Sequence, residues 1–373
     1  MRDRPVAFLF LGETLLIPHL YPIVEALAAD GDVAIDLWVA TSVHEQLLTR
    51  WSEGLAKVRI RRAPGFRALP AGADGRNPPL PAKIPTLVRL VPHLSRAGVV
   101  VCAEQTSLWL PRALPFLPPF VKTSHGVGSM SARDDPRRRA AALTLVPSER
   151  ERATYLARDF APERIVATGY VKAGFRQRSV TRPPFAADDR PTILYAPHWQ
   201  RHRSSWWSWG EAVVRRIVAD GRWNLIFAPH QRLLEGAPDI RMLMAELDRH
   251  PHVHCDADGF AMVDGSYTAA ADLYLGDTSS QVIEFLIRPR PCVFLNPANI
   301  AWADDPAYAQ WACGPVVDRL DDLLPTLAAA PAGHGDYAAI QARFAAESLG
   351  DASGDAPARA AAAIRAFLAG SGR

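Results

Sequence analysis

The sequence predicts an α/β protein of two doubly wound domains that face each other across a cleft. Short apolar runs of strand length alternate along the chain with segments of helical periodicity, a pattern typical of largely parallel sheets. The proline- and charge-rich segment 176–191 has no periodicity and divides the strands into two series. The chain has 373 residues, which is enough for two ordinary domains. In such domains, ligands bind at the carboxyl ends of the strands.

The first domain is expected to span residues 1–180. Its helical patterns include residues 20–30 and 148–159, and the proline-rich segment 68–83 is expected to be a loop on the cleft side. The apolar runs that we predict as strands are residues 6–11, 33–40, 58–61, 99–103, 120–124 and 143–147.

The second domain is expected to span residues 190–350. Its predicted strands are residues 193–196, 225–228, 253–255, 273–276 and 292–295, with helical patterns at 209–220, 241–249 and 280–287. Residues 351–373 are assigned separately, because the alanine-rich stretch 355–369 is typical of a terminal helix.

Composition and charge exclude some classes of function. The 42 basic and 39 acidic residues leave a net charge of +3, the basic residues are spread evenly, and no nucleic-acid-binding module is present, so we expect no nucleic-acid partner. The four cysteines are far apart and lack a CxxC pair, which indicates reduced thiols in a cytoplasmic protein.

The start of the chain is interpreted as a strand. The apolar run 6–11 is short and Glu13 soon interrupts it, which argues against a signal peptide. No stretch approaches the roughly 20 apolar residues that a membrane span requires. Any membrane contact is therefore expected to be peripheral, at the inner membrane face. The basic segment 135–141 is either a patch for anionic lipid or acceptor phosphate, or an ordinary solvated helix face.

Three predicted strands end in a histidine. His125 closes "FVKTSHG", His198 closes "TILYAPHW" and His230 closes "NLIFAPHQ". Proline cannot continue a central strand, so the two Ala-Pro-His sequences put His198 and His230 at the edge of the sheet. Three histidines in equivalent positions favour a functional role. His19 is a weaker candidate that could simply pack against its helix.

The segment "AADLYLGDTSSQVIEFL", residues 270–286, runs from a strand into a helix. Its backbone N–H groups, the hydroxyls of Thr278, Ser279 and Ser280, and the helix dipole form an anion site that suits a phosphate. Glu284, one turn further on, could reach ribose hydroxyls. Capping of the helix by Asp277, Thr278 and Ser279 is the structural alternative, and the two roles are compatible.

These segments resemble the CDP-glycerol glycerophosphotransferases, enzymes of teichoic-acid-type polymer synthesis with a GT-B fold of two Rossmann-like domains. Residues 271–285 resemble the family's "aDxLITDYSSxxFDF" block, and "SHG" at 124–126 resembles its "HGT". "VPSERERATYLARDFAPERIVATGY" resembles its helix and "tGyPR" turn, "ILYAPHW" its "ILYAPTW", and "FAPHQ" its "RxHP" element. The match runs in order from about residue 120 to residue 295.

The sequence departs from the family at several motif positions. Met130 replaces the lysine of "HGTPLK", and Val171 and Lys172 replace the "PR" of the turn. His198 stands in place of a threonine, and Gln200 in place of the arginine that follows. The resemblance therefore supports the architecture more firmly than the donor.

The resemblance implies a nucleotide-diphosphate donor, preferably CDP-linked, bound to the second domain. Its phosphates would contact Ser279, Ser280, Thr278 and His198, with His230 donating a hydrogen bond and Glu284 holding the ribose. His125 would take the proton from the attacking hydroxyl of a glycan or lipid-linked acceptor. Fixed donors and a helix dipole would stabilise the leaving group, so neither metal nor cofactor is expected. The cleft wall would comprise Gly126, Trp199, Arg201, Arg203 and Trp206.

Three other functions remain open. A GT-B glycosyltransferase would use a UDP- or CMP-linked sugar in cell-surface polysaccharide synthesis. A UDP-sugar 2-epimerase-like isomerase would need acidic groups around the sugar and no acceptor. A non-catalytic nucleotide-sugar or glycan-binding protein would tolerate the loss of His125.

Two clusters invite a metal interpretation. Asp256 and Asp258 form a D-x-D sequence, but aspartate and glycine clusters commonly mark loops. His250, His252 and His254 alternate and would share one face of an extended segment. Because no fourth ligand with familiar spacing is evident, surface or edge histidines are the favoured interpretation.

Overall fold

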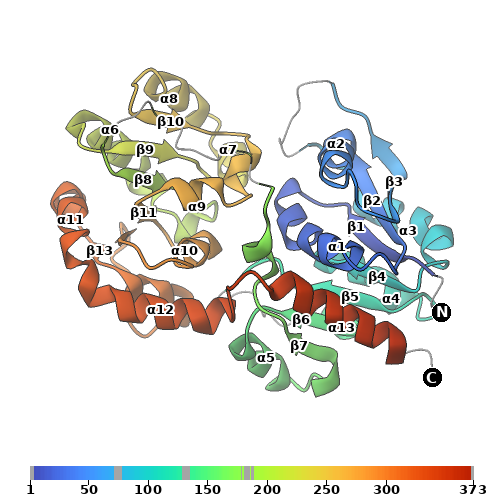
Figure 1. Ribbon diagram of the computed structural model, residues 1–373. Coiled ribbons are helices and arrows are strands. Elements are labelled where there is room, and N and C mark those ends of the chain that lie inside the picture. The colour runs from blue at the N-terminus through green and yellow to red at the C-terminus, as the bar shows by residue number, and fades with distance from the viewer. Residues whose placement is uncertain are drawn as a thin grey trace. The chain divides into compact units, whose positions relative to one another are not determined.

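The computed structural model describes residues 4–70, 78–127, 135–177, 179, 185 and 189–370 (Figure 1). The chain divides into two compact units. Unit 1 consists of Met1–Gln177 and Ala346–Arg373, and unit 2 of Arg178–Ala345. Each unit contains its own parallel sheet with helices, which confirms the α/β class and the two doubly wound sheets.

The sheet of unit 1 has the strand order β3-β2-β1-β4-β5-β6-β7, and every pair is parallel. Strand β1 is buried along its whole length, since it lies in the middle of the sheet between β2 and β4. The strands are β1 (Val6–Phe10), β2 (Ile35–Thr41), β3 (Val58–Arg67), β4 (Val99–Cys102), β5 (Phe120–Thr123), β6 (Leu143–Val146) and β7 (Ile165–Ala167).

The α-helices of unit 1 include the C-terminal one, which returns to pack beside the first. Arg365 on this last helix donates to the carbonyl oxygens of Ala26 and Leu27, at 3.3 and 3.1 Å. The helices are α1 (Tyr21–Ala28), α2 (Ser42–Trp51), α3 (Lys83–Leu94), α4 (Trp109–Ala113), α5 (Glu149–Leu156) and α13 (Ala356–Gly370).

The sheet of unit 2 repeats this winding, with the order β10-β9-β8-β11-β12-β13. Its strands are β8 (Thr192–Tyr195), β9 (Asn224–Phe227), β10 (Val253–Cys255), β11 (Leu273–Gly276), β12 (Cys292–Leu295) and β13 (Val316–Val317). Its helices are α6 (Glu211–Asp220), α7 (Gln231–Gly236), α8 (Ile240–Leu247), α9 (Ser266–Ala270), α10 (Ser280–Phe285), α11 (Leu323–Ala329) and α12 (Gly335–Leu349), the last of which leads into unit 1.

Short helical turns connect these elements. They are η1 (Thr14–His19), η2 (Gln105–Leu108), η3 (Pro136–Ala140), η4 (Pro162–Arg164) and η5 (Val171–Gly174) in unit 1, and η6 (Arg201–Arg203), η7 (Trp206–Gly210, a π-helix), η8 (Phe260–Met262), η9 (Pro306–Cys313), η10 (Leu320–Asp322) and η11 (Ala332–His334) in unit 2.

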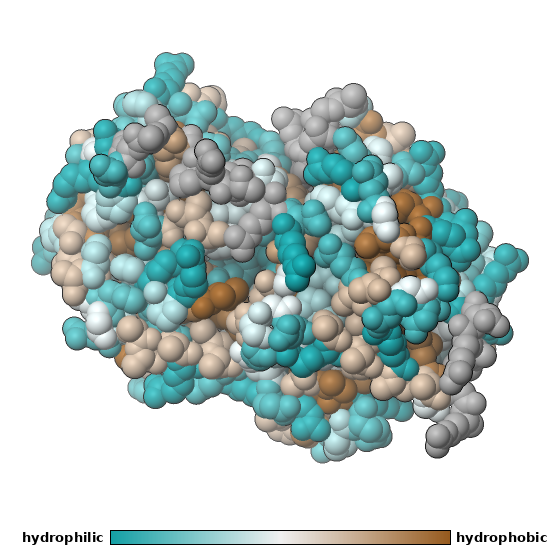
Figure 2. All heavy atoms as spheres, viewed as in Figure 1, coloured by the Kyte–Doolittle hydropathy of each residue, from teal (hydrophilic) through white to brown (hydrophobic). Residues whose placement is uncertain are grey.

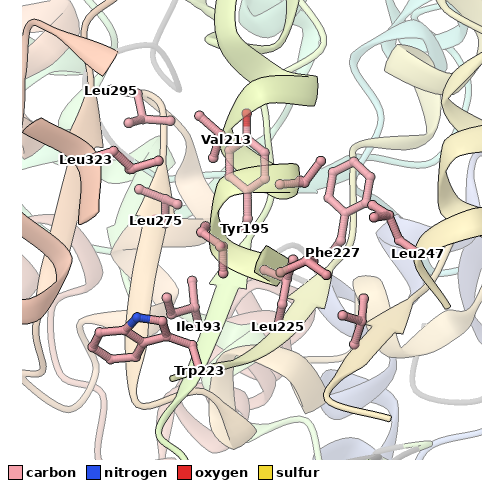
Figure 3. Packing of buried hydrophobic residues seen from close by; sticks show 14 of the residues in the cluster. Ile193, Tyr195, Val213, Trp223, Leu225, Phe227, Leu247, Leu275, Leu295 and Leu323 are labelled. Atoms are coloured by element: carbon pink, nitrogen blue, oxygen red, sulfur yellow. The ribbon is translucent and has the colours of Figure 1, made fainter. Parts of the chain in front are cut away.

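The core of unit 2 fixes the strand ends that matter for function. In Figure 3, side chains of β8 and β9 meet those of α6 and α8 in one buried cluster. Strands β8 and β9 each place a large ring here, and the Tyr195 and Phe227 rings stack with centroids 5.8 Å apart. Because these rings are fully buried, the residues that follow β8 and β9 are held firmly at the sheet edge.

The predicted strands are all present, and the structure adds two short ones, β7 and β13. Three further findings refine the sequence analysis. The basic segment 135–141 forms η3, in which Arg139 is exposed, whereas Arg138 is buried and donates to the Tyr155 hydroxyl. Of the predicted loop 68–83, residues 71–77 lie outside the described residues, as does most of segment 176–191. The four cysteines are free thiols.

No helix in the described ranges is long and apolar enough to cross a membrane.

Candidate functional site

Both sheets reverse their direction of winding at one point, between β1 and β4 in unit 1 and between β8 and β11 in unit 2. In doubly wound sheets this switch point, at the carboxyl ends of the strands, is where ligands bind. The residues that follow β8, β9 and β11 therefore define the candidate site of unit 2. Those that follow β1, β4 and β5 define the candidate site of unit 1.

A buried carboxylate, Asp277, occupies the switch point of unit 2. Asp277 directly follows β11, and its two carboxylate oxygens accept hydrogen bonds from the backbone N–H groups of His198, at 2.8 Å, and Ser205, at 3.0 Å. The hydroxyl groups of Ser205 and Tyr195 share a hydrogen bond of 2.9 Å beneath this loop. One carboxylate thus holds both ends of loop 198–205.

Burial changes the acidity of this carboxylate. Loss of solvent raises the pKa of Asp277 to about 7, against the opposing effect of its hydrogen bonds to His198 and Ser205. Asp277 is 1% exposed. The sequence allows Asp277 to be a helix cap, whereas in the structure its carboxylate clamps the loop 198–205. An acidic residue at a strand end is the only local signal, because the partners of Asp277 lie more than 70 positions away along the chain.

His198 lies at the start of the clamped loop. Its Nδ1 accepts a hydrogen bond from the backbone N–H of Gln200, at 3.1 Å, so the ring proton is on Nε2. Burial, followed by the positive charges of His230, Arg203 and His202, lowers the pKa of His198 to about 3. His198 is therefore neutral near pH 7 and presents an Nε2–H donor.

His230, at the end of β9, has the same local geometry. It caps α7, and its Nδ1 accepts from the backbone N–H of Arg232, at 3.1 Å, which again puts the ring proton on Nε2. The Trp199 ring contacts both histidine rings, with centroid distances of 5.9 Å to His198 and 6.3 Å to His230. The carboxyl edge of unit 2 therefore brings two predicted histidines together as a pair of donors.

The tryptophans of residues 199–209 are mainly packing residues. Trp206 was expected to line a binding surface, but its ring stacks on Phe227 with centroids 5.4 Å apart. The physical reason is η7, in which Gly210 leaves room for the indole: a Cβ on Gly210 would overlap the Trp206 ring. Arg201 lies over the Trp207 ring, 4.0 Å from its centroid.

Arg203 and His202 are the residues of this loop whose charges help to lower the pKa of His198. The Arg203 charge is the larger influence of the two. Arg203 is partly exposed.

The start of α10 contains the other predicted phosphate ligands. The Ser279 side chain caps the helix by accepting from the backbone N–H of Gln281, at 3.1 Å. The Thr278 hydroxyl donates to the carbonyl oxygen of Ala307, at 2.7 Å, and also accepts from Gln310, so it supports η9. At 3% exposed, Thr278 can offer a ligand its backbone N–H but not its hydroxyl.

Ser280 and Glu284 complete the predicted phosphate and ribose group. Ser280 is the first residue of α10, and its side chain lies outside the described part of the structure. Glu284 lies one turn further along α10 and is partly exposed.

The candidate site of unit 1 is built around His125, an exposed residue that follows β5. Its Nδ1 lies 2.8 Å from the carbonyl oxygen of Ala103, at the end of β4. A carbonyl oxygen only accepts, so Nδ1 carries the proton and Nε2 holds the lone pair. His125 thus has its lone pair on Nε2, whereas His198 and His230 have a proton there. Gly126, directly after it, has open space around its α-carbon.

His19 is buried near several basic groups of unit 1. Burial, and then the charges of Lys172, His125 and Lys122, hold the pKa of His19 well below its usual value. The His19 ring packs edge-on against Tyr170, with centroids 5.7 Å apart. His19 is therefore a buried packing residue, the alternative to a functional role that the sequence left open.

A charged pair that the sequence analysis did not single out lies at the switch point of unit 1. Glu104, directly after Ala103, forms an ion pair with Lys83 at the start of α3. Gly12 lies directly beside it, since a Cβ at this position would overlap the Glu104 carboxylate as it is placed here. His44 bonds to the Gly12 carbonyl oxygen, at 2.9 Å. The signal available in the sequence was an acidic residue at a strand end, as for Asp277.

The two candidate metal clusters have other partners. Asp256 accepts from the backbone N–H groups of Asp258 and Gly259, at 3.1 and 2.6 Å, and from the Tyr267 hydroxyl, at 2.6 Å. Arg241 pairs with Asp258, at 2.7 Å. Within the ranges that the structure describes, no group of three or more His, Cys, Asp or Glu residues is placed to hold a metal ion.

The chain is similar to several solved structures in its fold. No protein-family model and no curated protein sequence matches the chain. A putative UDP-N-acetylglucosamine 2-epimerase from Listeria monocytogenes is similar, with 15% identity, a TM-score of 0.66, and coverage of 99% of this chain and 97% of the other. The S. aureus MnaA–UDP co-structure has 14% identity, a TM-score of 0.67, and coverage of 98% and 97%. A variant of the wall teichoic acid polymerase TagF soaked with CDPG has 13% identity, a TM-score of 0.61, and coverage of 99% and 89%.

The fold is of the GT-B type. At these identities the similarity establishes the GT-B architecture alone, and the resemblance to CDP-glycerol glycerophosphotransferases stays a prediction. Within this GT-B fold, the sequence-predicted residues fall into two groups. His198, Trp199, Arg203 and His230 gather at the carboxyl edge of unit 2, whereas His125 and Gly126 lie at the carboxyl edge of unit 1.

Proposed function

We propose that the chain is an enzyme acting on a substrate linked to a nucleoside diphosphate, which binds at the carboxyl edge of unit 2. The observation that carries the proposal is the histidine pair, in which both His198 and His230 have Nε2–H donors and pack on Trp199. Such donors suit phosphate oxygens. Solved structures of similar fold support this ligand class, since they were solved with UDP, UDP-GlcNAc or CDPG.

The remaining contacts are proposed from the start of α10. Its backbone N–H groups, with Ser279 and Ser280, would bind the phosphates, and Thr278 would contribute through its backbone alone. Glu284 would hold the ribose hydroxyls. Arg203 would add positive charge beside His198.

The proposed reaction is transfer of a glycerol-phosphate or related polyol-phosphate group from a CDP-linked donor to a hydroxyl of a glycan or lipid-linked acceptor. The hydroxyl oxygen forms a bond to the β-phosphorus of the donor, and the bond from that phosphorus to the bridging oxygen breaks. CMP leaves, and the Nε2 atom of His125 takes the hydroxyl proton. The tautomer of His125 supports this role, because its bond to the Ala103 carbonyl leaves the lone pair on Nε2.

A second candidate is a UDP-sugar 2-epimerase-like isomerase. The structural similarity favours it, because the solved 2-epimerases have TM-scores of 0.62 to 0.66 against 0.61 to 0.62 for TagF. Glu104 also supplies an acidic group at the carboxyl edge of unit 1, although Lys83 pairs with it. A glycosyltransferase that uses a UDP- or CMP-linked sugar would need the same nucleotide contacts and an acceptor.

The cellular setting follows from the acceptor. A cytoplasmic enzyme that uses a lipid-linked acceptor would work at the inner membrane face as a peripheral protein.

A thermal-shift screen tests the proposal. We expect CDP, CMP or CDP-glycerol to raise the unfolding temperature by several degrees, since a ligand at 100 times its dissociation constant stabilises a protein by about 2.7 kcal/mol. A response confined to UDP and UDP-sugars, with epimer formation in the absence of acceptor, would replace the transfer reaction by the isomerase. Absence of any nucleotide response would refute the ligand class itself.

A further inference from the structure

Unit 1 has an exposed apolar surface on α3 and on the segment that follows β4. Ile84 and Val88 on α3 are 50% and 58% exposed, and Trp109 and Phe116 are 45% and 73% exposed. Figure 2 shows hydrophobic side chains scattered among hydrophilic ones on the visible face of unit 1. We call these four residues the α3 surface. Among the other described residues, the large hydrophobic side chains exposed in this way are Met242 and Ile287.

The two segments of the α3 surface share one core beneath it. The inner faces of α3 and of residues 108–117 belong to the same buried cluster. The shared residues are Leu87, Leu90, Leu94, Leu108, Leu110 and Leu117. The exposed side chains are thus not parts of a poorly folded segment, because each segment already buries its own apolar face.

The outer face of α3 has a regular pattern. Ile84, Val88 and Pro92 follow one another at intervals of four and form one apolar stripe along the helix. Arg89 and Arg96 are exposed beside this stripe. An exposed apolar stripe bordered by cations is typical of helices that lie in a membrane interface.

The charge of residues 78–127 also indicates a membrane as the partner. Between residues 78 and 127 the sequence contains one acidic residue, Glu104, and Lys83 pairs with it. Arg89, Arg96 and Arg112 are exposed and form no ion pair with any described residue.

The arginines of β3 provide a contrast. There, Arg59 and Arg61 pair with Asp36, and Arg62 pairs with Glu45. Arg59 and Arg61 thus share one carboxylate, whereas Arg89, Arg96 and Arg112 near the α3 surface have no acidic partner among the described residues.

We propose that the α3 surface docks unit 1 onto an anionic membrane. The apolar side chains would enter the boundary between headgroups and acyl chains, and the arginines would contact lipid phosphates. Trp109 suits such a boundary, and the Arg112 guanidinium lies over its ring, 5.5 Å from the centroid. Docking of this kind needs no membrane-spanning helix.

The position of the α3 surface relates docking to the proposed reaction. Ile84 directly follows Lys83, whose partner Glu104 lies at the carboxyl edge of the unit 1 sheet, the edge that also presents His125. A lipid-linked acceptor held by the membrane would thus meet the end of unit 1 that bears the proposed base. This step rests on the proposed function, whereas docking itself does not.

Vesicle co-sedimentation tests the docking proposal without any activity measurement. We expect the full chain to bind vesicles of phosphatidylglycerol and phosphatidylcholine, and to bind pure phosphatidylcholine far less. Ile84→Ser with Val88→Ser should weaken binding about tenfold, because two apolar side chains no longer enter the interface. Arg89→Glu with Arg112→Glu should weaken it about thirtyfold and reduce its salt dependence.

Met242→Ser is the matched control. Met242 on α8 of unit 2 is 69% exposed, so its replacement removes a comparable apolar side chain away from the α3 surface, and binding should not change. Circular dichroism verifies that each variant is folded. Equal binding to both vesicle types, or equal loss in the Met242 variant, would overturn the proposal. Self-association that Ile84→Ser with Val88→Ser abolishes, without vesicle binding, would instead assign the surface to a second copy.

Discussion

The carboxyl edges of the two units have the same strand order at the switch point but opposite chemistry. In unit 2, His198 and His230 accept backbone hydrogen bonds at Nδ1 and therefore keep their protons on Nε2. In unit 1, His125 donates from Nδ1 to a carbonyl oxygen and keeps a lone pair on Nε2. The topology decides where these histidines lie, and the backbone partner of Nδ1 decides what each can do.

The same contrast holds for the acidic residues beside them. Asp277 in unit 2 is held by the backbone N–H groups of His198 and Ser205, whereas Glu104 in unit 1 is paired with Lys83. The carboxylate of unit 2 thus supports a loop, and that of unit 1 lies beside a cation. One edge is suited to hold negative charge and the other to receive a proton.

The largest expected effect is a loss of turnover on replacing His125 of unit 1. His125→Asn retains a side-chain N–H that can donate to the Ala103 carbonyl oxygen, but it removes the basic Nε2 atom. We expect turnover to fall about 10³-fold, within the range typical of a lost general base. Nucleotide affinity, measured by calorimetry, should be nearly unchanged. Equal loss of affinity and turnover would mean that His125 binds the ligand and is not the base.

The second prediction concerns Asp277 and the stability of unit 2. Its folded pKa of about 7 lies above the ordinary value of 3.8, so the folded state binds a proton that the unfolded chain releases between these values. The free energy of unfolding should therefore decrease as the pH rises from about 4 to about 7, by up to about 4 kcal/mol. Asp277→Asn lacks this titration.

Urea unfolding at several pH values checks this prediction through tryptophan fluorescence, since most tryptophans lie in unit 2. The quantity to compare is the difference in unfolding free energy between wild type and Asp277→Asn, because His198 and the other groups titrate in both proteins. This difference should favour the wild type most near pH 4 and least near pH 8. If the two proteins had parallel profiles of unfolding free energy against pH, the pKa of Asp277 would not be raised in the folded state.

The sequence was sufficient for the fold because its signals are local. Every predicted strand is present, since each is an apolar run between helical patterns. The missed strands, β7 and β13, cover only Ile165–Ala167 and Val316–Val317, too short for any periodicity. The strand-end histidines were also found in this way, because Ala-Pro-His marks the position where a central strand stops.

The details of the site depend on distant contacts, which the sequence does not reveal. The Thr278 hydroxyl looked like a phosphate ligand, but Ala307 and Gln310, which come from η9, engage it. Trp206 looked like part of a wall, but the π-helix lays its ring on Phe227. In each case a partner about 20 to 30 positions away decides the role.

The smallest expected effect is a loss of nucleotide affinity on replacing either His198 or His230 of unit 2. His198→Asn and His230→Asn each keep a side-chain oxygen that can accept the backbone N–H two residues ahead, so the turn and the α7 cap should survive. Each removes the Nε2–H donor. A hydrogen bond to a charged group contributes about 1.5 to 3 kcal/mol, so each variant should bind the nucleotide at least about tenfold more weakly.

Turnover at saturating substrate separates this effect from that of His125. If the histidine pair holds the phosphates equally in the ground and transition states, KM rises in both variants while kcat stays near the wild-type value. His250→Asn is the control, since His250 is an exposed histidine of the same unit that pairs with the His252 ring. A fall in kcat with unchanged KM would instead mean that His198 or His230 acts on charge that develops during the reaction, and the division of donors and base between the two units would no longer hold.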